Sequence, residues 1–209
     1  MFNICQRCGQ YRADKEIDPS GPYAVCPECG ERYAFQMLPL LLICGPSGGG
    51  KSAVLRALLG KVDNAVLLEG DLLWRPEFNR PEDSYRDFYE TWLRLAKNIN
   101  QSGRPVALFN AGAIPPNVEP CVERRYFSKT HYLALVCDDA VLEMRLKARP
   151  SWRASGDREF IEAQVQFNQW LKDNAAATEP AIDLLDTTMA GEAETAAAAA
   201  RWLQAHIGL

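Results

Sequence analysis

Short apolar runs alternate along this chain with longer segments in which apolar side chains recur every three or four residues. The runs contain few charges and are four to six residues long, and they lie at 40–44, 65–68, 105–109, 132–137 and 182–185. Runs of this length are typical of strands that are buried on both faces of a parallel sheet. We therefore expect five buried strands.

The segments between these runs have the residue spacing of helices. Helices are predicted at 51–60, 81–100, 139–148, 157–174 and 192–205. In the second of these, the positions that follow one helix face are Tyr85, Phe88, Tyr89, Trp92, Leu95 and Ile99. We expect most of these side chains to pack in the core. Strands that alternate with helices predict a three-layer α/β fold with a parallel sheet, in which ligands bind beyond the carboxyl ends of the strands.

The composition fits a globular, acidic protein. Its 209 residues suffice for one medium domain or for one domain with a small appendage, and an apolar share of 47% supports a full core. A net charge of −4 argues against a general nucleic-acid coat, which would be basic. No stretch approaches about 18 consecutive apolar residues, and the first residues lack the layout of a signal peptide. We expect a cytoplasmic protein with no membrane partner.

Four of the seven cysteines form two Cys-x-x-Cys pairs near the amino terminus, Cys5 with Cys8 and Cys26 with Cys29. In a cytoplasmic protein this spacing indicates a metal site rather than disulfides. Two such turns, separated by 17 residues, are able to meet as a tetrahedral site of four thiolates. Residues 3–34 resemble the zinc-ribbon and rubredoxin-like families, which implies Zn²⁺ or, less often, Fe at these four cysteines.

The role expected for this metal is structural. A segment this short buries too little surface to fold alone, and four thiolates leave no open position for a catalytic water. A redox role for either pair is the less favoured alternative. The sequence leaves open whether the segment also binds a protein or a nucleic acid, although its nearly balanced charge argues weakly against a nucleic-acid grip.

The first buried run leads directly into Gly45-Pro46-Ser47-Gly48-Gly49-Gly50-Lys51-Ser52. This is the Walker A pattern in its expected context of buried strand, glycine-rich loop and helix. Backbone N–H groups of the loop and of the helix N-terminus, as far as Ala53, would surround phosphates. Lys51 would reach the β- and γ-phosphates, and the Ser52 hydroxyl would bind Mg²⁺. The motif predicts an ATP-type nucleoside triphosphate with Mg²⁺.

A carboxylate follows the second strand. Asp71 is expected at the carboxyl rim of the sheet near the γ-phosphate, where it would orient or deprotonate an attacking hydroxyl. A helix cap or a solvated turn is the structural alternative for Asp71. Trp74, Arg75, Phe78 and Arg80 follow at once. This cluster suits a flat or anionic substrate, but simple packing explains Trp74 and Phe78 equally well.

Positive charges concentrate after the fourth strand. The residues are Arg145, Lys147, Arg149, Arg153 and Arg158, within fourteen positions of an otherwise acidic chain. Arg145 and Arg149 share a helix face, because they are four residues apart. Arginines on a closing loop stabilise the charge of a transferring phosphoryl group, so Arg145, Arg149 and Arg153 are candidate catalytic residues. The alternative is a solvated basic face.

Together these features resemble the nucleoside monophosphate kinases and small-metabolite kinases, over about residues 38–206. The shared features are Walker A, a Gly-Asp after the second strand, an arginine-rich lid, and Leu184-Leu185-Asp186-Thr187. The segment Glu69-Gly70-Asp71 resembles the Asp-Gly-Asp of gluconate-type kinases. The resemblance implies a P-loop NTPase fold with the P-loop strand central among five, and an acceptor site near Asp71. Asp186 and Thr187 would lie near the base of ATP. Residues 1–36 are then a zinc ribbon and 37–209 a P-loop kinase-like domain.

One position departs from the family pattern. The third strand of these kinases often ends in an aspartate that helps to hold Mg²⁺, whereas this chain has the neutral Asn110. Arg124 and Arg125 are able to recognise an anionic acceptor or, equally, to pair with Glu119 and Glu123 on a helix surface. The acceptor is therefore open, with a nucleoside or nucleotide as the first class and a sugar acid or similar metabolite as the next.

The sequence predicts an ATP-dependent small-molecule kinase with a structural zinc ribbon. The rival is a nucleotide-dependent switch or slow ATPase that docks a protein or a nucleic acid through the ribbon. A zinc hydrolase is excluded because the chain has no His/Glu cluster. Its two histidines, His131 and His206, are far apart in sequence and are expected to be structural.

Overall fold

The computed structural model describes residues 3–153 and 155–207. Its large sheet consists of β4 (Leu40–Cys44), β5 (Val66–Glu69), β6 (Val106–Phe109), β7 (Thr130–Val136) and β8 (Ile182–Asp186). All four strand pairings are parallel, and the strand order is β5-β6-β4-β7-β8. The strand that leads into the Walker A loop is thus central, as predicted.

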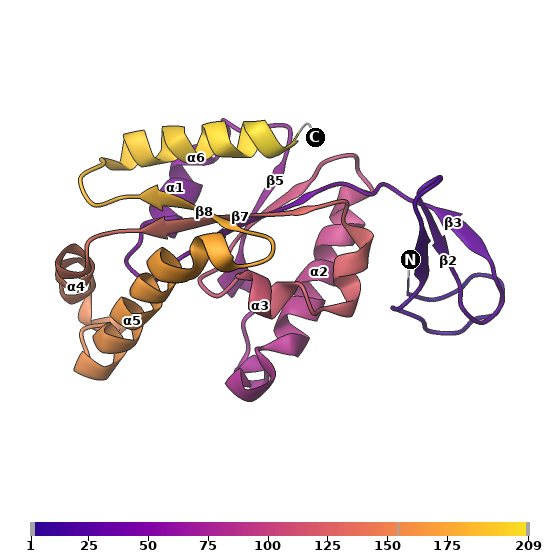
Figure 1. Cartoon of the computed structure of the whole chain (residues 1–209), viewed down its shortest axis with the longest axis horizontal. Coiled ribbons are helices and arrows are strands. Elements are labelled where there is room, and N and C mark those ends of the chain that lie inside the picture. Colours follow the sequence, from indigo (N-terminus) through magenta and orange to yellow (C-terminus); the bar gives the residue numbers. More distant parts are fainter. Residues whose placement is uncertain (1–2, 154, 208–209) are drawn as a thin grey trace.

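Helices cover both faces of this sheet (Figure 1). They are α1 (Lys51–Leu58), α2 (Arg86–Asn100), α3 (Pro115–Val118), α4 (Asp139–Lys147), α5 (Arg158–Asn174) and α6 (Glu192–Ile207). α1 and α6 lie on one face, and α2, α3 and α5 lie on the other. This is the three-layer α/β architecture that the sequence predicts. Among the described residues, none of the helices combines the length and the apolar content that crossing a bilayer demands.

The central strand β4 is buried on both faces, which explains its continuous apolar sequence. Leu40, Leu42 and Cys44 point toward the layer that contains α2, whereas Leu41 and Ile43 point toward α1 and α6. All five side chains are fully buried. Because successive strand residues face opposite sides, a strand covered on both faces must be apolar at every position.

The helix predicted at 81–100 begins later than expected. Residues Pro81–Asp83 form a short 3₁₀ turn, and Ser84 and Tyr85 have φ values of 59° and 55°. A right-handed helix cannot run through two left-handed residues, so α2 starts at Arg86. The carboxylate of Asp83 accepts a hydrogen bond from the Arg86 N–H at 3.2 Å, which satisfies one of the free donors of the first turn.

The amino-terminal segment forms a separate antiparallel sheet of β1 (Glu16–Asp18), β2 (Tyr23–Val25) and β3 (Arg32–Ala34). We call this segment, residues 3–36, the ribbon. It lies at the amino ends of the large sheet's strands (Figure 1), because the chain passes from it straight into β4. The ribbon is therefore at the opposite end of the sheet from the Walker A loop.

The ribbon is joined to the large sheet's layers by buried polar contacts. Glu123, in the 3₁₀ segment Val122–Tyr126, is fully buried and accepts hydrogen bonds from Arg94 and Asn3 at 3.0 Å and from the buried Lys97. The Tyr126 hydroxyl donates to the carbonyl of Ala13 at 2.7 Å. These contacts fix the ribbon against α2.

Candidate functional site

A cleft of about 660 Å³ opens at the carboxyl ends of the large sheet's strands. The predicted residues that line it are Ser47, Gly48, Gly49, Gly50, Lys51, Ser52, Ala53, Asp71, Arg145, Arg149 and Arg153. Gly45 and Pro46 are buried behind this wall, at the start of the loop. Parts of the chain that are distant in sequence thus converge where parallel α/β folds bind ligands.

The loop between β4 and α1 has the backbone of a phosphate cradle. Gly45, Gly48 and Gly50 have φ values of 129°, 89° and 103°, which side-chain-bearing residues rarely adopt. A Cβ at Gly45 would lie 2.4 Å from the Leu135 carbonyl oxygen, so glycine is also required there by close packing against β7. The loop leads directly into α1, whose N-terminus faces the cleft with its free N–H groups.

Lys51 lies across this loop. Its Nζ donates hydrogen bonds to the carbonyl oxygens of Gly45 at 2.7 Å and Pro46 at 3.0 Å. Burial lowers the pKa of Lys51 to about 8, and the nearby Asp71 carboxylate acts in the opposite direction. A bound phosphate would favour the charged ammonium form, because an anion raises the pKa of a neighbouring amine. The site is thus suited to a polyanion.

The ends of β5 and β6 form the wall around Asp71. A Cβ at Gly70 would come within 2.5 Å of the Asn110 side chain, so the two strand ends touch only because residue 70 is glycine. The Asn110 Oδ1 accepts hydrogen bonds from the Tyr89 hydroxyl at 3.0 Å and the Gly112 N–H at 3.2 Å. Asn110 therefore organises this rim, while the exposed Asp71 carboxylate lines the open cleft.

The predicted lid arginines differ in their surroundings. Arg145 donates to the Thr187 hydroxyl at 3.0 Å and to the Thr187 carbonyl at 2.6 Å, which ties α4 to the end of β8. Burial and the neighbouring Arg153 lower the pKa of Arg149. The Arg153 guanidinium lies 5.0 Å from the centre of the exposed Trp152 ring. Two adjacent cations at the cleft make a site that an anion would stabilise.

Other basic residues singled out from the sequence are not part of the cleft lining. Lys147 pairs with Glu143 and Arg158 pairs with Glu162, each four residues along a helix. Arg124 pairs with Glu119 at 2.9 Å, whereas Arg125 donates to backbone carbonyls of the ribbon. The solvated-face interpretation thus holds for the first two. The pairing expected with Glu119 holds for Arg124, whereas Arg125 contacts backbone carbonyls and not Glu123.

The aromatic cluster after Asp71 divides into core and surface. Phe78 is buried and packs edge-on against Phe88, which confirms the packing alternative for that residue. Trp74 also contacts Phe88, yet 44% of it stays exposed. Arg75 covers the Phe78 ring, with its guanidinium 4.8 Å from the ring centre.

The cleft and the loop also contact residues to which sequence reasoning gave no role. Glu69 and Trp152 line the cleft, and Gln164 in α5 accepts a hydrogen bond from the Ser47 N–H at 2.7 Å. The position of Glu69, two residues before Asp71 at a strand end, was a usable signal for its place at the rim. Nothing in the sequence marks Gln164, because its contact depends on how α5 packs.

A second candidate site lies in the ribbon. The sulfur atoms of Cys5, Cys8, Cys26 and Cys29 all lie within 4.8 Å of one another. The Sγ separation is 3.6 Å for Cys5 and Cys29 and 3.9 Å for Cys8 and Cys26. Four sulfurs around a tetrahedral zinc, with Zn–S bonds of about 2.3 Å, are separated by about 3.8 Å. The donor set therefore fits Zn²⁺.

The two knuckles have matching backbones. Gly9 and Gly30 have φ values of 72° and 73°, and each donates its N–H to the carbonyl of the cysteine four residues earlier at 2.9 Å. The Tyr33 hydroxyl contacts the Cys5 sulfur at 3.2 Å, and this hydrogen bond lowers the pKa of Cys5 to about 6. At Cys29 the Glu31 N–H favours the thiolate, but burial and the neighbouring cysteines outweigh it and raise the pKa to about 12, so a bound cation would be needed to stabilise that thiolate.

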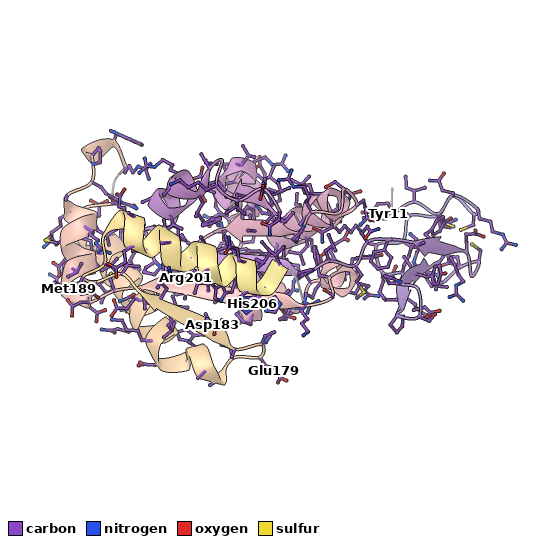
Figure 2. All side chains as sticks on the ribbon, turned by 90° about the horizontal axis from the view of Figure 1, so that it is seen from above. Tyr11, Glu179, Asp183, Met189, Arg201 and His206 are labelled. Atoms are coloured by element: carbon purple, nitrogen blue, oxygen red, sulfur yellow. The ribbon has the colours of Figure 1, made fainter. Side chains whose placement is uncertain are left out.

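The two histidines meet in space despite their sequence separation. The rings of His131 in β7 and His206 in α6 have centroids 4.4 Å apart. The His206 ring also contacts the ring of Trp202, tilted by 40°, and the Trp202 indole N–H donates to Asp183 at 2.7 Å. Figure 2 shows His206 and Asp183 close together. This cluster is at the amino end of β7, far from the cleft, which agrees with a structural role.

Comparison with known proteins places this fold. The sequence matches no protein-family profile and no curated protein. The solved structures that resemble the chain include an unliganded sugar kinase from Janibacter, with a TM-score of 0.58 and 14% identity over 82% of this chain and 96% of that one. They also include a tunicamycin resistance protein from Deinococcus radiodurans (TM-score 0.57, 17% identity, 82% and 96%) and a gluconokinase from Sinorhizobium meliloti (TM-score 0.53, 20% identity, 81% and 96%). The chain has the fold of the P-loop small-molecule kinases. None of these three structures indicates a nucleoside or nucleotide acceptor.

Proposed function

We propose that this protein is an ATP-dependent kinase that phosphorylates a hydroxyl group of a small molecule. The observation that carries the proposal is the convergence in one cleft of the Walker A loop, the Asp71 carboxylate and the two adjacent arginines Arg149 and Arg153. Phosphoryl transfer needs positioning and charge stabilisation more than covalent chemistry, and these are the groups that supply both.

The triphosphate would lie along the loop. The backbone N–H groups of Gly48 and of residues 50–53, together with the ammonium of Lys51, would hold the β- and γ-phosphates. Ser52 would bind Mg²⁺ through its hydroxyl, and the Glu69 and Asp71 carboxylates supply further hard oxygen donors in the same cleft. Mg²⁺, when bound, neutralises charge that develops on the phosphate oxygens. These carboxylates compensate for the neutral Asn110, whose Oδ1 is already engaged.

The acceptor would bind beside Asp71. Its carboxylate would accept the proton of the attacking hydroxyl, or fix that hydroxyl in line with the γ-phosphate. Arg149 and Arg153 would stabilise the transferring group, and Arg145 would act by holding the lid helix to Thr187. A hydroxylated metabolite such as a sugar or sugar acid is the favoured acceptor class, because two of the similar structures are a sugar kinase and a gluconokinase.

The cluster of four cysteines would hold a structural Zn²⁺. All four ligands are protein thiolates, so the ion has no free position for substrate. We propose that residues 1–36 form this zinc domain and 37–209 the kinase domain. The zinc domain would stabilise its own fold and the buried contacts around Glu123.

The rival function, docking of a nucleic acid through the ribbon, is disfavoured by the ribbon's charges. Among its described residues every cation has a partner: Arg7 pairs with Glu31, Arg12 with Asp14 and Glu28, Arg32 with Asp18, and Lys15 donates to a backbone carbonyl. Nucleic-acid binding requires cations that are free to contact the phosphates of the nucleic-acid backbone. The ribbon, near Tyr11 in Figure 2, also lies at the opposite end of the molecule from Met189, which precedes the cleft residue Ala190.

The test is a screen of hydroxylated metabolites with γ-labelled ATP and Mg²⁺. We expect label transfer to one acceptor, loss of transfer in Asp71→Asn, and ATP affinity within about threefold of wild type in that variant. Acceptor-independent hydrolysis that a nucleic acid or protein stimulates would support the rival. No ATP binding by calorimetry, with no effect of Lys51→Ala, would refute both.

A further inference from the structure

One hydrogen bond ties the phosphate loop to the helix that follows the lid. The Ser47 N–H donates to the Gln164 Oε1 at 2.7 Å, across a sequence separation of 117 residues. Ser47 lines the cleft, whereas Gln164 is not among the lining residues found in the described part of the chain. The Ser47 N–H therefore points to the outer side of the loop, away from the space that phosphates would occupy.

The tip of the loop is seated between both helices that carry the lid. A Cβ at Gly48 would come within 2.9 Å of Leu142 and 3.3 Å of Leu146, so α4 packs directly against the loop. Gln164, in α5, holds the residue just before Gly48. The segment that joins α4 to α5 bears Arg149 and Arg153. The loop tip and the two arms of the lid thus form one connected unit.

We propose that Gln164 is a positioning residue for the phosphate loop, an inference that rests on the proposed function. Its amide oxygen fixes the backbone at Ser47 and so the shape of the turn that leads to Lys51. Donors that converge on a phosphate are effective when they are held in place before it binds. Without Gln164 the Ser47 N–H would have only water as a partner, and the turn would lose its fixed shape.

A different role would have the opposite consequence. If Gln164 occupied an N–H that a phosphate oxygen later takes, its removal would free a donor and strengthen binding. The outward direction of the Ser47 N–H argues against this placeholder role and for an anchor. If the contact plays no part in binding, its removal would leave the affinity unchanged. Weaker, stronger or unchanged affinity in a Gln164 variant therefore distinguishes an anchor, a placeholder and a contact with no role in binding.

The experiment measures the affinity of the full chain for inorganic tripolyphosphate and for ATP, each with Mg²⁺, by calorimetry. Gln164→Met removes the acceptor at nearly constant volume, and Gln164→Asn keeps the amide but withdraws it by one methylene. We expect both variants to bind both ligands about 2- to 10-fold more weakly, since a part-buried hydrogen bond that is exchanged for one with water is worth roughly that much. Gln166→Met, an exposed neighbour on the same helix, is the matched control and should bind as wild type.

The outcomes separate this inference from the proposed function. Wild-type affinity in both Gln164 variants, or tighter binding, overturns the positioning role and leaves the kinase proposal standing. Failure of wild type to bind tripolyphosphate and ATP overturns both. Weakened binding counts in favour only if the melting temperature of at least one variant stays within a few degrees of wild type. If both variants melt earlier together with the loss of binding, the contact is merely structural and the inference falls.

Discussion

The buried carboxylate of Glu123 provides a test of how the ribbon is held that is independent of catalysis. Its side chain has no exposed surface, and that of Lys97 is 1% exposed. Glu123→Gln would keep the shape but remove the charge that faces Lys97, Arg94 and Asn3. Burial lowers the pKa of Lys97, and the Glu123 carboxylate opposes that shift, so the variant leaves a buried cation less compensated.

The magnitude follows from the exposure of each partner. Breaking a buried ion pair by removing one member costs about 3–5 kcal/mol. The Arg94 contact adds at most about 1 kcal/mol, because that side chain is 44% exposed and screened by solvent. For a chain of this size, roughly 2–4 °C of melting temperature corresponds to each kcal/mol. We therefore expect Glu123→Gln to melt about 6–24 °C below wild type.

Thermal unfolding by calorimetry and circular dichroism measures this shift. The double variant Glu123→Leu with Lys97→Met should be less destabilised than Glu123→Gln, because it leaves neither member of the buried pair charged, and the Arg94 side chain, which also loses Glu123, is 44% exposed to solvent. Glu82→Gln, which alters an exposed pair with Arg80, is the control and should change stability by less than about 0.5 kcal/mol. A Glu123→Gln variant that melts at the same temperature as wild type, or a double variant that melts below Glu123→Gln, would refute the reasoning.

Three further predictions address the sites and the far end of the sheet. Asp71→Asn should lower kcat by about 100-fold or more while the affinity for ATP is kept, as single-turnover and binding assays would show; equal losses in both would contradict its acceptor role. Cys26→Ser, or a strong chelator, should unfold the ribbon, remove stoichiometric zinc by elemental analysis and lower the melting temperature, whereas Cys44→Ser should retain the zinc. Burial and the neighbouring His206 lower the pKa of His131 below 6.5. As the pH falls, the unfolded chain therefore protonates this residue before the folded chain does. The free energy of unfolding should then decrease as the pH drops below about 6.5. Replacement by glutamine, His131→Gln, should flatten that slope in denaturant titrations at pH 7 and pH 5.5, and an unchanged slope would show that His131 does not titrate there.

Much of the fold was predictable because its signals are local and strong. The apolar run that became β4 and the glycines after it dictate a strand, a turn with positive φ and a helix, each through neighbouring residues alone. The two Cys-x-x-Cys pairs are equally local, and the sulfur separations agree with the tetrahedral site they predict.

The parts that sequence missed depend on tertiary packing. Ser84 and Tyr85 have no residue-type signal for left-handed backbone, so the start of α2 was placed five residues too early. The sequence left open whether Arg124 binds an acceptor or pairs with Glu119, because this depends on where the folded chain places the side chain. Gln164 and the ring contact of His131 with His206 link residues from distant segments, which no periodicity reveals.

Helix α2 connects the ribbon with the rim of the cleft. Lys97 in its last turn and Gln101, which directly follows the helix, form hydrogen bonds with the ribbon. Tyr89 and Trp92 in its first turns donate to Asn110 and to the Gly70 carbonyl. Deletion of the ribbon would remove these hydrogen bonds and expose the carboxyl end of α2 at Lys97 to solvent. Any loosening would then be transmitted to the rim that supports Asp71 sooner than to the glycine loop on the central strand.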